Sequence, residues 1–236
     1  MIALPVYNTD AAMYTVRPSK IIALGMNYRE HVEEIHSVQI NYTANEEPAE
    51  PILFAKTPNA LTGPDYPVML PAILSRYSFN PARTDYEAEL AFFVSDDCRN
   101  VPEADVWKHI YGFTCANDIS QRDIQRTDKS GWFRGKSFDT FCPVGPRLVL
   151  TQDIGDAGNL HIECRLNGKV VQSSTTAAMI FSIPVLFSFI SRNFTLNTGD
   201  LILTGTPSGV GPIKPGDVME VEIEKIGVLR NPVKAG

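Results

Sequence analysis

The sequence predicts a mostly β domain with flanking helices, an α+β fold. Many short apolar segments of strand length alternate with glycine-rich and proline-rich turns, whereas few segments have a helical pattern. The chain has 236 residues, of which 44% are hydrophobic, and it shows no internal repeat or low-complexity tract. That length and composition can build one substantial core, so we expect one main domain.

The amino-terminal part of the chain predicts an extension followed by a strand, a turn and a helix. Residues 1–18 carry no motif and are expected to be an N-terminal extension, with the main domain at 19–234. The apolar run Ile21–Leu24 predicts a buried strand, and a glycine turn leads to a helix from about Tyr28 to His36. Residues 41–81 contain many prolines and glycines among short apolar pieces, which is typical of loops and short strands.

Strands dominate the rest of the chain, with two further helices. We expect a strand over Tyr86–Val94, a helix around Glu103–Ile110 behind a proline, and a strand over "YGFTCANDIS". Asn167-Gly168 in "LHIECRLNGKVVQ" predicts a β-hairpin, since this dipeptide favours a tight turn between two strands. A helix from about Thr176 to Arg192 follows serine and threonine cap candidates, and the segments after it are again rich in strands.

The charge and the cysteine content argue against several classes of function. The chain has 27 acidic and 21 basic residues, and its formal net charge of −6 opposes the phosphate contacts that nucleic-acid binders make. Four cysteines lie far apart without a CxxC pair, so we expect neither a zinc framework nor a disulfide scaffold, and a reducing cytoplasm fits best. The amino terminus lacks a basic region and the longest apolar stretch is interrupted, so we expect no export signal and no membrane span.

Two glutamates interrupt the apolar stretch "TDYEAELAFFV". Because side chains alternate along a strand, Glu87 and Glu89 share one face, with Cα atoms roughly 6–7 Å apart. Burying two like charges together is unfavourable unless a cation, a lysine or an arginine lies near them. Asp118 ends a second apolar strand and can supply a third carboxylate of the hard-oxygen set that Mg²⁺ or Mn²⁺ prefers. The alternative is a solvent-facing edge strand, on which alternating glutamates are ordinary.

Three more charged residues are candidates for chemistry. His31 and Glu34 lie three residues apart on the expected helix, where a carboxylate can fix the tautomer of an imidazole and raise its basicity. This pair is either a general base with its orienting acid or part of an acidic surface helix. Lys136, in "SGWFRGKSFD", is either a solvated surface lysine or an ammonium that meets an anion in a constrained loop.

Five stretches follow one another along the chain: "GMNYREHVEE", "DYEAELAFFV", "ANDISQRDIQ", "RGKSFDTFCPVGP" and "LTGTPSGVG". In this order they resemble the fumarylacetoacetate hydrolase family, and the resemblance covers about Ile21 to Val233. It implies a mixed β-roll with flanking helices, of the type of that family's C-terminal domain. It also implies a homodimer or a larger homo-oligomer.

The resemblance implies roles for individual residues. Family members bind a divalent cation through positions that match Glu87, Glu89 and Asp118, and we expect Mg²⁺ or Mn²⁺, with Ca²⁺ as an alternative. The dyad that activates water in acylpyruvate-cleaving members matches His31 and Glu34. The remaining matches are the substrate-facing lysine, Lys136, and three substrate contacts, Arg122, Gln125 and Thr206.

Family members act on small 2-oxo or 1,3-dioxo acids, which implies several reactions at one site. A metal that chelates a 2-oxo acid stabilises a pyruvate enolate, and water activated by His31 would cleave acylpyruvates such as fumarylpyruvate or acetylpyruvate. In this reaction Lys136 would steady the developing oxyanion. Because of the dyad, we expect this hydrolysis.

Three alternatives to hydrolysis remain. Two are enzymes of aromatic-compound degradation that use the same site, an oxaloacetate decarboxylase and a 2-hydroxyhepta-2,4-diene-1,7-dioate isomerase or decarboxylase. The third is a catalytically silent binding protein of this fold. Residues 73–83, "ILSRYSFNPAR", lead directly into the glutamate strand and are therefore a candidate for the rim of the pocket.

Overall fold

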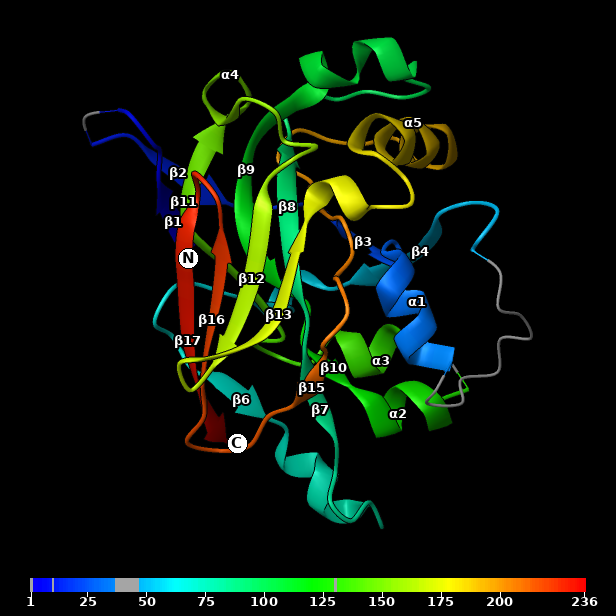
Figure 1. Cartoon of the computed structure of the whole chain (residues 1–236), viewed down its shortest axis with the longest axis vertical. Coiled ribbons are helices and arrows are strands. Elements are labelled where there is room, and N and C mark those ends of the chain that lie inside the picture. Colours follow the sequence, from blue (N-terminus) through cyan, green and yellow to red (C-terminus); the bar gives the residue numbers. More distant parts are fainter. Residues whose placement is uncertain (1, 10, 37–46, 130) are drawn as a thin grey trace.

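The computed structural model describes residues 2–9, 11–36, 47–129 and 131–236. Among these residues, the largest sheet has seven strands and mixed pairing. In sheet order they are β4 (Ile52–Lys56), β3 (Ile21–Gly25), β14 (Leu201–Leu203), β8 (Ala88–Val94), β9 (Ile110–Asn117), β11 (Cys142–Leu150) and β5 (Leu61–Thr62). The architecture is mostly β with few helices, as the sequence predicts (Figure 1).

A second sheet, of five strands within the described residues, packs against the first. In order they are β13 (Lys169–Thr175), β12 (His161–Leu166), β16 (Val218–Ile223), β17 (Gly227–Ala235) and β6 (Val68–Leu70). The predicted hairpin is confirmed, because Asn167 and Gly168 join β12 to β13 with φ angles of 54° and 78°. Two successive positive φ angles are typical of the type I′ turn that this dipeptide favours.

Strand β8 lies at the centre of the core. All seven of its residues are buried, and it pairs with β14 on one side and β9 on the other. Its Phe92 ring packs against Phe113 and Phe187, with ring centroids 6.0 and 5.9 Å apart. The strand that carries Glu89 is therefore interior on both faces, an environment that an edge strand does not have.

Two smaller sheets complete the β structure. Strands β1 (Ile2–Pro5) and β2 (Met13–Val16) form an antiparallel pair, so the predicted N-terminal extension contains a hairpin. Leu4 and Val16 are buried within the main core. The other small sheet joins β10 (Ser120–Gln121), β7 (Thr84–Tyr86) and β15 (Gly211–Pro212), next to the glutamate strand.

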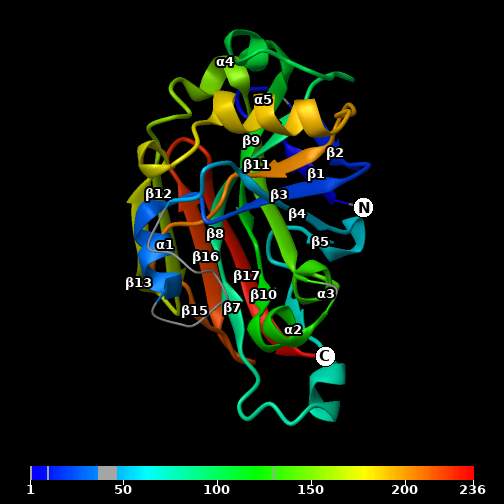
Figure 2. The same ribbon diagram turned by 90° about the vertical axis from the view of Figure 1, so that its right-hand side faces the viewer.

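The helices of the described chain lie outside the sheets. They are the α-helices α1 (Arg29–His36), α2 (Arg122–Thr127), α3 (Phe133–Lys136), α4 (Thr151–Ile154) and α5 (Ile183–Asn193), and the 3₁₀ helices η1 (Pro58–Ala60), η2 (Ala72–Arg76), η3 (Glu103–His109) and η4 (Thr176–Ala178). Helices α1, α2 and α3 lie on the same side of the molecule (Figures 1 and 2). None of these helices is long and apolar enough to cross a membrane.

Two of the predicted helices differ from the structure. The helix predicted at 103–110 is a 3₁₀ helix, η3. The helix predicted at 176–192 is a single 3₁₀ turn, an extended link and then α5. The N–H groups of Ile180 and Phe181 donate to the backbone and side-chain oxygens of Asn27, both at 2.8 Å. Because these tertiary bonds use the N–H groups, the link cannot join a continuous helix.

The region predicted as loops and short strands, 41–81, matches the structure where it is described. It contains β4, β5 and β6 with two 3₁₀ helices, whereas residues 41–46 lie outside the described residues. η2 projects from the body of the molecule beyond β6 and β7 (Figures 1 and 2).

Candidate active site

A break between two strands places the first glutamate. β7 ends at Tyr86 and β8 begins at Ala88, so Glu87 lies at the junction. The N–H of Glu87 donates to Asn117 Oδ1 at 2.9 Å, and its carbonyl accepts from the N–H of Asp118 at 2.8 Å. These two bonds join the junction to the end of β9 and bring Asp118 beside the glutamate strand.

Glu87, Glu89 and Asp118 form one buried carboxylate cluster. Their exposed fractions are 4%, 1% and 0%, and one carboxylate oxygen from each lies within 4.8 Å of the others. The alternative of a solvent-facing strand edge is therefore wrong for this pair. Three hard oxygen donors at one point suit a cation such as Mg²⁺ or Mn²⁺.

Basic side chains compensate for the buried negative charge. Lys136 Nζ lies 2.5 Å from Glu87 Oε2 and 2.6 Å from Asp118 Oδ2, and Lys56 Nζ lies 2.5 Å from Asp118 Oδ1. Arg122 Nη2 donates to Glu87 Oε1 at 2.5 Å. Lys136 is 3% exposed, so it is not a solvated surface lysine. A carboxylate oxygen has two lone pairs, so it can accept one of these bonds and still bind a cation.

The two glutamates have opposite electrostatic environments. Burial acts to raise the pKa of Glu87, but the positive charges of Arg122 and Lys136 outweigh it and hold that pKa well below its usual range. Burial raises the pKa of Glu89 well above its usual value, and the negative charges of Asp118 and Glu87 raise it further. Glu87 is therefore the permanent anion of the pair, and Glu89 takes up a proton readily.

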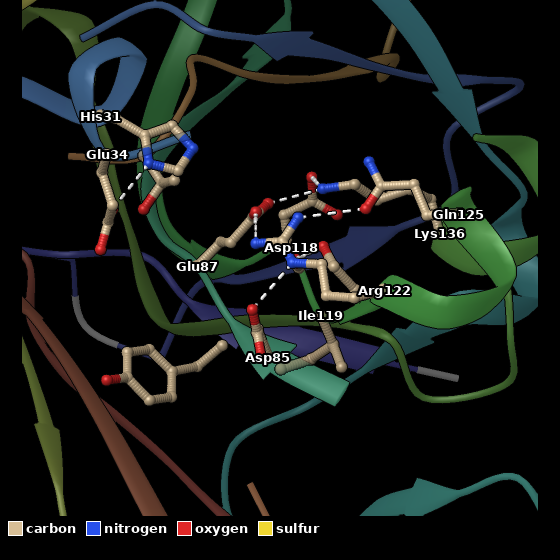
Figure 3. Close-up of polar contacts among 12 residues, drawn as sticks. His31, Glu34, Asp85, Glu87, Asp118, Ile119, Arg122, Gln125 and Lys136 are labelled. Carbon is tan, nitrogen blue, oxygen red and sulfur yellow. Dashed lines mark hydrogen bonds and ion pairs between the residues drawn. The ribbon is translucent and has the colours of Figure 1, made fainter. Parts of the chain in front are cut away.

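His31 and Glu34 form the expected pair on α1. His31 Nδ1 lies 3.1 Å from Glu34 Oε2, and this oxygen also accepts from the N–H of Gly209 at 3.1 Å. Burial acts to raise the pKa of Glu34, but the hydrogen bond to His31 contributes to a net lowering. His31 is 4% exposed, so the alternative of an acidic surface helix is wrong for it. Figure 3 shows the second ring nitrogen turned toward Glu87.

One narrow pocket collects most of the predicted site residues. Its lining comprises Leu24, Gly25, Met26, His31, Phe54, Glu87, Glu89, Arg122, Gln125, Trp132, Lys136 and Thr206. Asp118 and Glu34 are not in the lining, but each bonds to a lining residue, Lys136 and His31 respectively. The histidine dyad and the Lys136 side lie on opposite sides of the Glu87 carboxylate (Figure 3).

Arg122 and the Gln125 amide form a polar wall beside the carboxylates (Figure 3). Arg122 Nε donates to Asp85 Oδ2 at 2.8 Å, and its Nη1 donates to Gln125 Oε1 at 3.1 Å. Because the Gln125 oxygen is engaged, its amide N–H groups are the part available to a ligand. The predicted contacts Arg122 and Gln125 thus lie side by side in the lining (Figure 3).

An aromatic wall closes another side of the pocket and was not predicted. The rings of Phe54 and Trp132 meet edge to face, with centroids 5.3 Å apart, and Lys136 Nζ lies 4.7 Å from the Phe54 centroid. Gly25 leaves room for the indole, because a Cβ at this position would lie 2.7 Å from the Trp132 ring. The glycine turn after the first strand therefore has a packing role at the pocket.

Other contributors were also missed, although the sequence held some signal for them. Lys56 ends the apolar strand of "PILFAK", where a buried ammonium requires an acidic partner. Asp85 shares the alternation of the two glutamates. The 73–83 segment supplies none of the described lining residues; its Tyr77 hydroxyl accepts from Arg134 on α3 at 2.8 Å.

The turn that follows β14 also contacts the glutamate strand. The N–H of Gly205 donates to Glu89 Oε2 at 2.6 Å, and Thr206 beside it lines the pocket. Gly205 has a φ of 94°, and a Cβ there would lie 2.8 Å from the Cβ of Asn27. Glycine is therefore required for the backbone to approach both the carboxylate and the start of α1.

Known proteins share this architecture. A mitochondrial oxaloacetate tautomerase of Xenopus laevis is 42% identical over 224 residues, 92% of this chain and 66% of that protein. The structure of a fumarylpyruvate hydrolase from Pseudomonas aeruginosa in complex with Mn²⁺ and pyruvate matches with a TM-score of 0.85 at 26% identity, and the match covers 100% of this chain and 96% of that one. The structure of a 2-hydroxyhepta-2,4-diene-1,7-dioate isomerase from Mycobacterium marinum matches with a TM-score of 0.79 at 36% identity, over 97% and 82% of the two chains.

The family model described as fumarylacetoacetate (FAA) hydrolase C-terminal matches residues 20–234. This match spans nearly all of the chain and agrees with the order of motifs and with the fold. The chain therefore belongs to the fumarylacetoacetate hydrolase C-terminal family.

Proposed function

We propose that this chain is a divalent-metal-dependent enzyme that forms the enol or enolate of a small 2-oxo acid. The observation that carries the proposal is the arrangement of the carboxylate cluster and the His31–Glu34 dyad around one narrow pocket. The names of the three similar proteins above give three reactions, tautomerisation, isomerisation and hydrolysis. In each of them a proton is transferred or a bond is broken next to a carbonyl group. A shared enolisation step accounts for one site in all three.

Glu87, Glu89 and Asp118 would hold the cation, since they supply three clustered oxygen donors. When bound there, a divalent cation supplies Lewis acidity that favours negative charge on a neighbouring carbonyl oxygen. The similarity to a protein solved with Mn²⁺ supports Mn²⁺ or Mg²⁺ as the ion.

The chain's own side chains would bind the acid and move its protons. Arg122 and the amide of Gln125 donate to the substrate carboxylate, and the buried ammonium of Lys136 stabilises the developing oxyanion. His31 accepts a proton through its second ring nitrogen, while Glu34 holds the first nitrogen and stabilises the positive charge of the ring.

Oxaloacetate tautomerisation is the first candidate reaction. It requires that the carbon next to the carbonyl group lose a proton and the carbonyl oxygen gain one, or the reverse, with His31 as the base and acid at the carbon. It is also the reaction of the relative that is 42% identical.

Hydrolysis of an acylpyruvate is the second candidate, and it is the reaction expected from the motifs. It is favoured by the dyad, which can activate water, and by the similarity to the fumarylpyruvate hydrolase. In this case His31 deprotonates water instead of carbon.

A substrate panel with Mn²⁺ tests the proposal. The enol absorbance of freshly dissolved oxaloacetate and the cleavage of acetylpyruvate and fumarylpyruvate are followed for native protein, His31→Ala and Glu89→Gln, against buffer with Mn²⁺ alone. We expect native protein to accelerate oxaloacetate ketonisation, and His31→Ala to lose at least about a hundredfold in rate, the usual contribution of a general base. Glu89→Gln should also lose activity, because it removes a proposed ligand of the cation. Activity on none of these acids would refute the proposed function, and cleavage without ketonisation would favour hydrolysis.

A further inference from the structure

Gln172 on β13 connects two parts of the candidate site from behind. It is 2% exposed, and its Oε1 accepts from the N–H of Ala88, between the two glutamates, at 3.0 Å. Its Nε2 donates to Thr206 Oγ1 and to the carbonyl oxygen of Pro207, both at 2.8 Å. Gln172 does not line the pocket, but every one of these partners belongs to a segment that does.

The three bonds leave one orientation for the Gln172 amide. The N–H of Ala88 can only donate, so it faces the amide oxygen, whereas the carbonyl of Pro207 can only accept, so it faces the amide nitrogen. The second hydrogen of that nitrogen then points to Thr206 Oγ1. Thr206 is thereby the acceptor in this bond, and its own hydroxyl hydrogen must point elsewhere.

Within the part of the chain that the structure describes, the pocket side of Thr206 is available for that hydrogen. Its side chain lines the pocket and is 3% exposed, while Gln172 is the partner of its oxygen on the protein side. The hydroxyl hydrogen can therefore be directed into the pocket, toward an acceptor on a bound ligand.

We propose that Gln172 is a positioning residue that makes Thr206 a hydrogen-bond donor to an anionic oxygen of the ligand. The proposal rests on the proposed function for the identity of that ligand, a 2-oxo acid with its carboxylate. A hydroxyl that rotates freely can donate or accept a hydrogen bond, whereas a hydroxyl fixed as a donor favours an anion over a neutral carbonyl compound. The fixed hydroxyl also loses no rotational freedom when the ligand binds. Gln172 thus contributes to specificity without touching the ligand.

Gln172→Glu tests the orientation with the smallest change of shape. At a pH high enough to ionise the new carboxyl group, the carboxylate still accepts from Ala88 but cannot donate, so the Thr206 hydroxyl turns to donate to it and leaves the ligand. Binding of oxalate, a small 2-oxo acid mimic, is measured by calorimetry in the presence of Mn²⁺. We expect Gln172→Glu and Thr206→Val each to weaken binding roughly tenfold or more, and Thr206→Ser to keep near-native affinity, because a hydrogen bond to a charged group is worth about that factor.

The double variant separates positioning from general support of the fold. If Gln172 acts through Thr206, adding Gln172→Glu to Thr206→Val weakens oxalate binding by less than twofold beyond the single variant. An equal effect of Gln172→Glu in the native and Thr206→Val backgrounds would overturn the proposal. Unchanged oxalate affinity in Thr206→Val would also overturn it, and this variant keeps the shape of the threonine side chain, so it tests the proposal even if Gln172→Glu does not fold. Failure of the native protein to bind oxalate with Mn²⁺ would instead refute the proposed function, and this role with it.

Discussion

At Gly25 the pocket depends on the absence of a side chain. Gly25→Ala would place a Cβ 2.7 Å from the Trp132 ring, so the indole must leave its present position. We expect kcat/KM for 2-oxo acids to fall about tenfold, with a loss of about 1–3 kcal/mol in the free energy of unfolding, the usual cost of overpacking. Steady-state kinetics and urea unfolding measure the two effects.

Trp132→Ala is the matched control for that substitution. Once the indole is absent, Gly25→Ala meets no ring, and its effect on kcat/KM should nearly vanish. A full tenfold effect in the Trp132→Ala background would show that Gly25 matters for another reason, such as the path of the backbone into α1.

The raised pKa of Glu89 predicts how the free energy of unfolding changes with pH. Its pKa in the folded protein is raised by burial and by the charges of Asp118 and Glu87. A carboxyl group with a raised folded pKa favours folding most below its ordinary pKa of about 4.3, and this contribution is lost as pH rises toward the folded pKa. In the presence of a chelator, the free energy of unfolding of the native protein should therefore fall with pH relative to that of Glu89→Gln.

The slope of that difference approaches about 1.4 kcal/mol per pH unit within the window. Urea unfolding of native protein and Glu89→Gln at a series of pH values between about 4 and 8 measures it. Parallel stability curves for the two proteins would contradict the raised pKa of Glu89.

Residue patterns identified the cluster but not its surroundings. Glu87 and Glu89 could be placed on one face because strand alternation is a local rule, and the Asp118 position follows from the end of a strand. The sequence could not place three of the cluster's surroundings, namely Lys56, Gln172 and the aromatic wall of Trp132. Each of them makes its contact with a segment that is far away in the sequence. The rules for such contacts are those of packing, which a single sequence does not reveal.

At the scale of elements, the local sequence predicted the structure correctly where the residues of a turn determine it. The hairpin at Asn167-Gly168 requires two left-handed residues, and the dipeptide supplies them at little cost. The helix predicted over 176–192 begins late because the N–H of Ile180 donates to the carbonyl oxygen of Asn27, a residue far away in the sequence. A tertiary bond outweighed the local helical pattern there.

The same asparagine holds the helix that carries the dyad. Asn27 is fully buried, and its Nδ2 donates to the carbonyl oxygens of Thr204 at 2.8 Å and Phe181 at 3.2 Å. Asn27→Ala removes these bonds, and leaving buried carbonyls unsatisfied should cost about 1–3 kcal/mol each. We also expect kcat to fall, because α1 begins two residues later and loses its anchor to the turn after β14.

Asn27→Asp helps to distinguish the effect on stability from the effect on kcat. An aspartate oxygen can still accept from the N–H of Phe181, but the side chain no longer donates to the carbonyl oxygen of Thr204. Urea unfolding gives the stability of both variants, and kcat for oxaloacetate ketonisation gives the placement of His31. A variant that is less stable but retains native kcat would contradict the role of this clamp in placing α1.

At the scale of the whole molecule, the fold gathers a nearly balanced set of charges around the candidate site. The carboxylates are Asp85, Glu87, Glu89 and Asp118. The cations Lys56, Arg83, Arg122 and Lys136 form ion pairs with Asp85, Glu87 and Asp118, whereas Glu89 accepts from the N–H of Gly205. When Glu89 is ionised, these eight groups sum to zero. A divalent cation adds two positive charges to this set, and a dianionic acid restores the balance.

This balance predicts that a divalent cation and a dianion stabilise the protein cooperatively. Because the site's own cations already neutralise its carboxylates, oxalate or Mn²⁺ alone should raise the melting temperature less than the two ligands together, beyond the sum of their separate effects. A ligand at about one hundred times its Kd adds about 2.7 kcal/mol, which for a chain of this size corresponds to a rise of roughly 5–11 °C. Differential scanning calorimetry with each ligand and with both measures the coupling. Asp118→Asn removes a proposed ligand and should abolish the joint rise, whereas additive shifts in the native protein would show that the two ligands bind independently.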